Sequence, residues 1–318
     1  MRRYDYHHND KLLLDKFYVV AVISNPARYT SRYNLYMKFR KHMEDSGVKL
    51  LTVELQLGQR AFQVTEPNNP LHLQLRSDEE LWHKENMINL GIARLPPDWQ
   101  YVAWIDADVE FIDREGWALE TVQQLQHFQI VQLFQNCIDL GPTGQAIQTH
   151  CGFVWSYLER KPFGKSYSYW HPGYAWAANR FAIDSLGQLL DIAILGSGDR
   201  HMALSLIGRA QSTFDERRTP LNNEYVRHVL RWQGRATQYI KRDIGFIPGT
   251  ILHGWHGKKK DRKYVERWEI LIKNNYDPEL DLKRDWQGVY TLTDRSPQLR
   301  DDLRFYLKAR NEDSIDMG

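Results

Sequence analysis

Cysteine is scarce in this chain of 318 residues, which contains only Cys137 and Cys151. Two thiols cannot build a framework of several disulfides or a zinc site of four cysteines. Long apolar runs are absent as well, since none approaches the roughly 20 residues of a membrane-spanning helix. The segment Met1–His8 lacks the apolar stretch of a secretion signal. We therefore expect a cytoplasmic protein, in the host cytoplasm if its source is a virus.

An excess of one charge sign is also missing. The 42 Lys and Arg residues nearly balance the 40 Asp and Glu residues, which leaves a formal charge of +2. Such a balance argues against binding to polyanions through bulk charge alone. Aromatic residues, in contrast, make up 13% of the chain and include 11 Trp and 17 Tyr. This content suits surfaces that stack on sugars as well as a packed core.

Apolar strands alternate with helical segments in the first half of the chain. Phe17–Ile23 and Lys49–Leu55 predict strands buried on both faces, and Tyr29–Met43 between them has a helical period. A strand, a helix and a strand in this order predict an α/β fold with a right-handed crossover. Further helices are expected over 79–94, 178–190, 200–207 and 297–310, strands over 101–105 and 128–134, and a loop over 157–174.

No internal repeat or low-complexity linker divides the chain. We expect one α/β domain over residues 1–256. Residues 257–318 are basic at first and helical at the end, which predicts a C-terminal extension packed on the same domain.

Two acidic residues follow the apolar strand over 101–105. Asp106 and Asp108 are two positions apart, and alternation along a strand directs both side chains to the same side. Ligands of open α/β sheets collect beyond the carboxyl ends of strands. Two carboxylates there repel each other unless a cation lies beside them, and a divalent metal ion is the natural candidate. Solvated acids at the start of a loop are the alternative.

His253 and His256 form a second cluster, flanked by glycines and preceded by an apolar pair. Two imidazoles together with an aspartate would make a mixed nitrogen and oxygen site suited to Mn²⁺ or a similar ion. Backbone hydrogen bonding by the histidines is the alternative. The cationic run 258–263 follows directly, and such runs usually form a solvated face. Beside a metal, Lys258 and Lys259 would hold a diphosphate.

The turn Gly196-Ser197-Gly198 leads into a predicted helix through Asp199 and Arg200. Its glycines permit unusual backbone dihedrals and a close approach of a ligand. Asp199 would then act either as the N-cap of the helix or as a general base.

Six segments between Phe17 and His256 resemble, in the same order, motifs of the GT-A-fold nucleotide-sugar glycosyltransferases, most closely those of the β-1,4-galactosyltransferase-like group. The segments are Pro26-Ala27-Arg28, Trp82 to Gly91, Asp106 to Asp108, Gly173 to Ala177, Gly196 to Asp199 and His253 to His256. The resemblance implies a GT-A (Rossmann-like) fold with a mixed, mostly parallel sheet flanked by helices.

The resemblance also implies roles for individual residues. Asp108, His253 and His256 would ligate Mn²⁺ or Mg²⁺, and Asp199 would be the catalytic base of an inverting transfer from a UDP-linked sugar. The residues expected to bind the nucleotide-sugar are Pro26, Arg28, Trp82, Lys84, Asp106, Lys258 and Lys259. The residues expected to contact the sugar or the acceptor are Trp170, Tyr174, Trp176 and Arg200.

Three positions depart from the family pattern. Thr30 stands in place of a second arginine, Gly198 in place of a glutamate, and His253 in place of a methionine. The family's membrane anchor and disulfides have no counterpart in this sequence. We therefore do not assign the acceptor sugar of the family to this chain.

The acceptor stays open among a hydroxymethylated base of viral DNA, a glycan, a lipid-linked or lipopolysaccharide precursor, and a protein. The cationic run 258–263, the pair Arg217-Arg218 and the series Arg227, Arg231, Arg235 and Lys241 would follow a phosphate backbone in the first case. Three other classes stay open on the residues alone. They are a glycoside hydrolase, a nuclease that uses Asp106, Asp108 and a lysine, and a binder without catalysis.

Overall fold

The computed structural model describes residues 12–112, 115–164, 169–215 and 221–317. Seven strands form the main sheet in the order β10-β6-β9-β4-β1-β2-β3, and all neighbours run parallel except β9, which is antiparallel to β4 and β6. The predicted α/β class with a mixed, mostly parallel sheet is confirmed. The strands are β1 (Phe17–Ser24), β2 (Lys49–Leu57), β3 (His72–Ser77), β4 (Tyr101–Ile105), β6 (Ile130–Gln132), β9 (Ala175–Asn179) and β10 (Ile244–Phe246).

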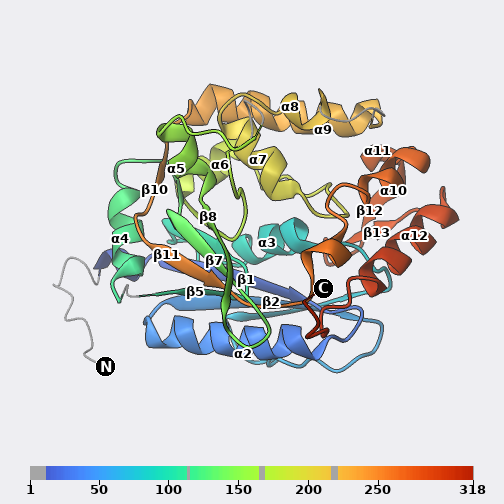
Figure 1. Cartoon of the computed structure of the whole chain (residues 1–318), viewed down its shortest axis with the longest axis horizontal. Coiled ribbons are helices and arrows are strands. Elements are labelled where there is room, and N and C mark those ends of the chain that lie inside the picture. The colour runs from blue at the N-terminus through green and yellow to red at the C-terminus, as the bar shows by residue number, and fades with distance from the viewer. Residues whose placement is uncertain (1–11, 113–114, 165–168, 216–220, 318) are drawn as a thin grey trace.

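Helices cover both faces of this sheet, as Figure 1 shows for α2 (Thr30–Asp45) on one side and α3 (Lys84–Ile92) on the other. Alternate residues of β1 enter the two cores: Val19 packs with Phe39 of α2, whereas Val20 packs with Met87 of α3. Burial on both faces explains why the strand is an unbroken apolar run. The other helices before residue 257 are α4 (Trp117–Gln124), α5 (Phe153–Leu158), α6 (Arg180–Leu186), α7 (Gly198–Leu206), α8 (Ser212–Asp215), α9 (Asn223–Arg235) and a π-helical turn (Ala236–Ile240).

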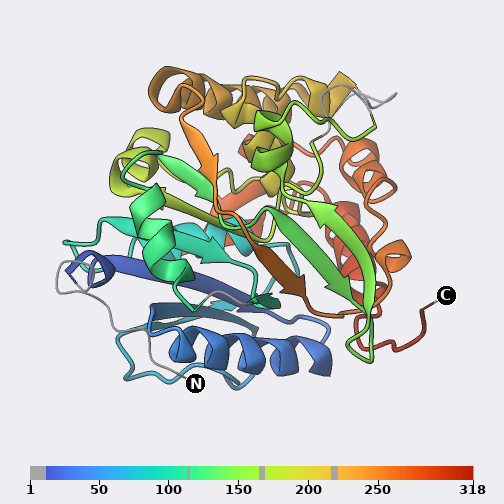
Figure 2. The same ribbon diagram turned by 60° about the vertical axis from the view of Figure 1, so that its left-hand side comes forward.

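A second, four-stranded sheet stands beside the first in the order β5-β11-β7-β8 (Figure 2). Its strands are β5 (Val109–Phe111), β7 (Asn136–Leu140), β8 (Ala146–Cys151) and β11 (Thr250–His253). The central strand β11 is antiparallel to β5 and parallel to β7. This small sheet brings the segment after β4 next to the segment that carries the two predicted histidines.

Residues 257–317 form a layer at one side of the sheet, with α10 and α12 near the C-terminus in Figure 1. They contact the earlier chain directly: Asn86 Nδ2 donates to the Gly288 carbonyl (3.1 Å), and the Tyr29 hydroxyl donates to the Lys308 carbonyl (2.8 Å). The domain boundary at 256 stays a prediction. The elements are a 3₁₀ turn (Lys259–Arg262), α10 (Trp268–Lys273), α11 (Pro278–Asp281), β12 (Leu282–Arg284), β13 (Tyr290–Leu292) and α12 (Pro297–Lys308).

Several predicted elements differ from the observed ones at their ends. The helix expected over 79–94 begins only at Lys84, because the Trp82 N–H donates to the Ile194 carbonyl (3.0 Å) and holds the preceding residues outside the helix. The helix expected over 178–190 is α6, since residues 178–179 end β9 and Gly187 ends the helix with φ of +79°. The strand over 128–134 shrinks to β6. Residues 153–158 form α5, which overlaps the start of the expected loop 157–174.

Among the residues that the structure describes, no helix combines the length and the apolar character needed to cross a lipid bilayer.

Candidate functional site

A cavity of about 780 Å³ opens at the carboxyl ends of β1 and β4. Its lining combines the turn after β1, the start of α3, the residues after β4, the start of α7, the end of β11 and the C-terminal layer. Ten of the predicted site residues lie in the lining: Pro26, Trp82, Lys84, Asp106, Asp108, Tyr174, Asp199, Arg200, His253 and His256.

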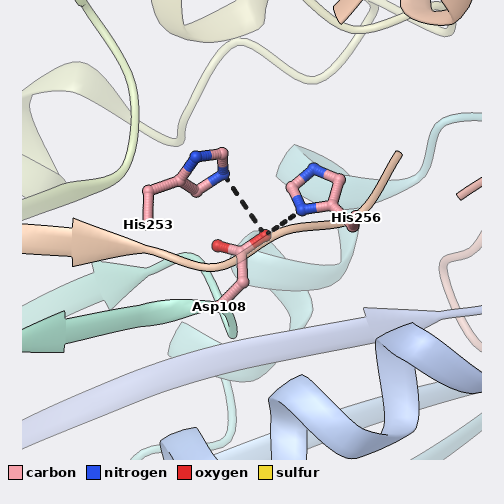
Figure 3. A group of neighbouring side chains, drawn as sticks. All are labelled: Asp108, His253 and His256. Carbon is pink, nitrogen blue, oxygen red and sulfur yellow. Dashed lines mark ion pairs between the residues drawn. The ribbon is translucent and has the colours of Figure 1, made fainter. Parts of the chain in front are cut away.

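Asp108, His253 and His256 converge in this cavity (Figure 3). Oδ2 of Asp108 lies 3.6 Å from Nε2 of His253 and 3.2 Å from Nδ1 of His256. The cause is strand register: His253 of β11 pairs with Val109 of β5, and the Gly254 N–H donates to the Asp108 carbonyl (2.8 Å). A shift of one residue in this register would turn the imidazole to the other face of the sheet.

The three side chains fit a divalent ion. Oδ1 of Asp108 and Nδ1 of His256 are buried and make no hydrogen bond to any residue in the described part of the chain. Buried polar atoms without partners are rare and call for an explanation such as an ion. The potential ligand atoms all lie within 4.8 Å of one another. One carboxylate and two imidazoles can ligate a divalent transition-metal ion. Mn²⁺ stays the ion that the sequence predicts.

Charges around this cluster agree with a cation site. Burial alone would raise the pKa of Asp108, but His253 and His256 hold it well below its usual range. Burial would lower the pKa of His253, yet the carboxylates of Asp108 and Asp139 raise it above its ordinary value. Burial and the neighbouring Arg262 keep the pKa of His256 low, so that this imidazole is neutral and able to donate a lone pair to a metal.

Asp139 orients His253 from the neighbouring strand β7. The two residues pair in the strand register, and Nδ1 of His253 donates to Oδ1 of Asp139 (2.8 Å). Asp139 is buried and also accepts from the Tyr174 hydroxyl (3.1 Å) and from Lys259. A proton held on Nδ1 leaves the Nε2 lone pair free on the side of Asp108.

Replacement of Asp139 by Asn should therefore weaken metal binding without removing a ligand. We expect a Kd for Mn²⁺ about 10- to 100-fold higher than that of the wild type, measured by titration calorimetry. Asp45→Asn, on an exposed part of α2, is the control with the same change of charge. Unchanged Mn²⁺ affinity in Asp139→Asn would show that Asp139 does not position His253.

Lys84 and Asp106 form an ion pair at the edge of the cavity. Burial works against the charge on Lys84, but Asp106, Glu85 and Asp199 raise its pKa above the ordinary value. The cation beside Asp106 is therefore a lysine, whereas Asp108 faces the histidines. The two aspartates of the motif serve different partners.

Asp199 occupies the first turn of α7 and accepts the backbone N–H of Arg200 through Oδ1 (2.8 Å). A Cβ atom at residue 173 would lie 2.5 Å from Oδ2 of Asp199, so glycine at this position leaves room for the carboxylate. The preceding Ser197 has φ of +75°, a conformation that side chains other than glycine adopt with strain. The backbone is thus held in an unfavourable shape that directs Asp199 into the cavity.

Glu85 is a buried acid that the sequence does not single out. Its carboxyl lies against Gly198, since a Cβ atom there would be 2.8 Å from Cδ of Glu85. Burial raises the pKa of Glu85 to about 8, with Lys84 opposing and Asp199 supporting the shift. Glu85 is therefore largely protonated at neutral pH in the folded state and ionised in the unfolded chain.

This difference predicts a pH-dependent stability. The folded state keeps a proton that the unfolded state loses above pH 4.5, so Glu85 destabilises the protein increasingly as pH rises from about 4.5 to 8. Glu85→Gln should gain stability over the wild type across this window, by up to about 4 kcal/mol at pH 8. Urea unfolding of both proteins at about pH 5, 6.5 and 8 measures the difference between their free energies of unfolding. Parallel curves for the two proteins would refute the assignment.

No family model matches the sequence, and no curated protein matches it. The structure is similar to solved glycosyltransferases. A Drosophila β1,4-galactosyltransferase 7 variant in complex with manganese, UDP-Gal and xylobiose aligns with a TM-score of 0.40, 11% identity and coverage of 90% of this chain and 98% of that chain.

The catalytic domain of the same Drosophila enzyme with xylobiose gives a TM-score of 0.31 at 11% identity, and the alignment spans 59% of each chain. A glycosyltransferase involved in the glycosylation of the major capsid of PBCV-1 gives 0.30 at 9% identity, covering 91% of this chain and 98% of that chain. These scores are low, so we base the function of this chain on its own residues.

Several predicted residues lie outside the cavity lining. Arg28 is exposed, Lys258 pairs with Asp316, and Lys259 pairs with Asp139. Trp176 is in the core, where its indole N–H donates to the Pro172 carbonyl (2.8 Å). Trp170 packs on Phe163, a lining residue, with 4.1 Å between the ring centroids. Tyr174 does line the cavity, and its ring stacks on His171 with 3.8 Å between the centroids.

The cations proposed to follow DNA are mostly engaged elsewhere. Arg227 pairs with Glu224 (2.5 Å), Arg231 lies 3.8 Å from Glu279, and Arg235 donates to the Leu186 carbonyl (2.7 Å). Lys241 follows the π-helical turn with φ of +55°. Arg217 and Arg218 fall outside the described residues.

Sequence reasoning missed the arginines that the C-terminal layer contributes to the cavity. Arg262, Arg267 and Arg310 all line it and are buried. Arg262 belongs to the cationic run that was expected to face solvent, and nothing in that run indicates which cation turns inward. Arg310 pairs with Glu312 (2.6 Å), which also pairs with Arg32 (2.5 Å).

Proposed function

We propose that this chain is a metal-dependent, inverting glycosyltransferase that moves a sugar from a UDP-linked donor to an acceptor hydroxyl. One observation carries the proposal: Asp108, His253 and His256 converge at the end of one cavity that also holds Asp199 and Lys84. Each of the six segments that resemble glycosyltransferase motifs contributes residues to this lining. In a nuclease or a hydrolase, Asp199 and the histidine pair would have no shared role in the reaction.

The metal ligands would be Asp108, His253 and His256, with Asp139 positioning His253. The bound ion supplies Lewis-acid stabilisation of the negative charge that grows on the departing diphosphate. Lys84 lies at the same wall of the cavity and adds positive charge, while its contact with Asp106 keeps the ammonium group in place. Trp82 and Pro26, which line the same cavity, would border the nucleotide.

Asp199 would act as the general base. The acceptor hydroxyl gives its proton to the Asp199 carboxylate as its oxygen forms a bond to the anomeric carbon. The bond between that carbon and the β-phosphate oxygen breaks, and its electron pair leaves with UDP. Attack opposite the leaving group inverts the anomeric configuration. The hydroxyl of a hydroxymethylated base in DNA is the first acceptor to test, and glycan or lipopolysaccharide precursors are the next.

A mass-shift screen of UDP-sugars against these acceptors tests the proposal. We expect an acceptor mass increase of one hexose, dependent on Mn²⁺ or Mg²⁺, with release of UDP. Cleavage of plasmid DNA without sugar transfer would support the nuclease instead. If the donor stays intact in every combination and no UDP binds, the result would support a binder without catalysis.

A further inference from the structure

Two buried arginines of the C-terminal layer line the cavity, and Arg262 is close enough to Asp108 to help lower the pKa of that carboxyl. Arg262 and Arg267, here called the arginine pair, are 7% and 6% exposed. Among the residues that the structure describes, neither forms an ion pair with a carboxylate, and the Nε atom of each is buried without a hydrogen-bond partner. Burial of an unpaired cation is unfavourable, so such residues indicate a site for an anion.

Hydrogen bonds and a ring contact hold both side chains of the arginine pair in place. Nη1 of Arg262 donates to the Tyr264 hydroxyl (2.9 Å), and the Arg267 guanidinium lies 5.1 Å from the centre of the same ring. Nη1 of Arg267 donates to the Tyr306 hydroxyl (3.2 Å), which in turn donates to the Arg262 carbonyl (3.0 Å). These contacts fix both guanidinium groups before any ligand arrives. Planar guanidinium groups held in this way suit phosphate or carboxylate.

Arg267 connects the arginine pair to the turn that precedes the proposed base, Asp199. Nη2 of Arg267 donates to the Ser197 hydroxyl (2.5 Å), two residues before Asp199. Tyr264 and Val265, between the two arginines in sequence, line the cavity with exposed fractions of 46% and 76%. Arg267 therefore lies beside the turn that carries the proposed base, and the residues between the two arginines in sequence reach the solvent-exposed part of the cavity lining.

The charge of the cavity exceeds what a nucleotide-sugar neutralises. Six cationic side chains line it (Arg32, Lys84, Arg200, Arg262, Arg267 and Arg310), against four carboxylates (Asp106, Asp108, Asp199 and Glu312). A divalent ion adds two positive charges, and the diphosphate of a nucleotide-sugar removes about two. With the ion and the nucleotide-sugar bound, the cavity therefore keeps an excess of two positive charges, which a second anion would balance.

We propose that the arginine pair binds a phosphate or carboxylate group of the acceptor, so that the acceptor of the proposed transferase is an anionic molecule. This inference rests on the proposed function of the cavity. The anionic group would anchor the acceptor at the rim and place a neighbouring hydroxyl beside Asp199.

The test titrates methyl phosphate, and separately acetate, into protein that is already saturated with Mn²⁺ and UDP. We expect methyl phosphate or acetate to bind to the UDP complex, and Arg267→Gln to weaken that binding about tenfold or more. The same variant should leave the Kd for UDP within about twofold. Arg304→Gln is the matched control, since Arg304 of α12 lies outside the cavity lining and pairs with Glu80.

Three outcomes overturn the inference while the proposed function stands. If UDP binds but neither probe does, the pair is not a site for an acceptor anion. If Arg267→Gln weakens UDP binding as strongly as probe binding, the pair holds the donor diphosphate. If UDP-glucuronate binds more tightly than UDP-glucose and Arg267→Gln removes the difference, the anion belongs to the donor sugar. Failure of UDP to bind in the presence of Mn²⁺ overturns the proposed function itself. Arg267→Gln removes an unpaired buried charge, so we expect its melting temperature without ligand not to fall, which shows that the variant is folded.

Discussion

Replacement of Asp199 by Asn should abolish sugar transfer while donor binding persists. The amide keeps the shape of the side chain beside Gly173 but cannot take a proton from the acceptor hydroxyl. Loss of a general base lowers kcat by about 10²- to 10⁴-fold. We expect the Kd for UDP in the presence of Mn²⁺ to change by less than about twofold, because Asp199 is not among the proposed metal ligands.

Initial rates of transfer and calorimetric UDP binding measure the two effects separately. Asp184→Asn is the control, since this aspartate is exposed on α6 and pairs only with Arg180 among the described residues. Normal transfer by Asp199→Asn would remove it from the mechanism. A parallel loss of UDP binding would place it at the donor instead.

The second large effect is expected at Asp108. Its replacement by Ala removes the carboxylate of the proposed metal site, so Mn²⁺ affinity should fall by about 100-fold or more and UDP binding should no longer respond to Mn²⁺. Asp106→Ala is the contrasting variant, because Asp106 pairs with Lys84. We expect it to disturb Lys84 and to retain Mn²⁺ binding within about tenfold.

Calorimetric titration of Mn²⁺ with and without UDP distinguishes the two aspartates. Chelation with EDTA should make wild-type protein behave like Asp108→Ala in UDP binding. Equal losses in both variants would mean that the carboxylates share one ion. A wild-type affinity in Asp108→Ala would show that the metal site lies elsewhere.

The strands of the main sheet could be predicted from the sequence because burial on both faces leaves an unbroken apolar run. β1 and β2 begin where the pattern places them, and helix α2 between them follows its helical period. The start of α3 could not be predicted, since the Trp82 N–H is bound by the Ile194 carbonyl from a distant segment. Local propensity contains no information on such a contact.

The candidate site was predictable as a set of residue types and not as a set of contacts. The Asp-x-Asp spacing indicated a cation but does not by itself distinguish the two aspartates, and the family resemblance assigned Asp108 to the metal together with the two histidines. The fold adds the contact between Lys84 and Asp106 and brings both histidines next to Asp108. Likewise the inward turn of Arg262 depends on Tyr264 and Tyr306, whereas Lys259 of the same run reaches Asp139.

The central claim is that a divalent ion binds between Asp108, His253 and His256. Crystals grown with Mn²⁺ and UDP, measured at the manganese absorption edge, test it most directly. We predict an anomalous peak within about 2.0–2.4 Å of one oxygen of Asp108 and one nitrogen of each histidine, with the diphosphate on the open side of the ion. A peak at Cys137, Asp139 and His150, the other described group of potential ligands, or no peak between the three residues, would contradict the account.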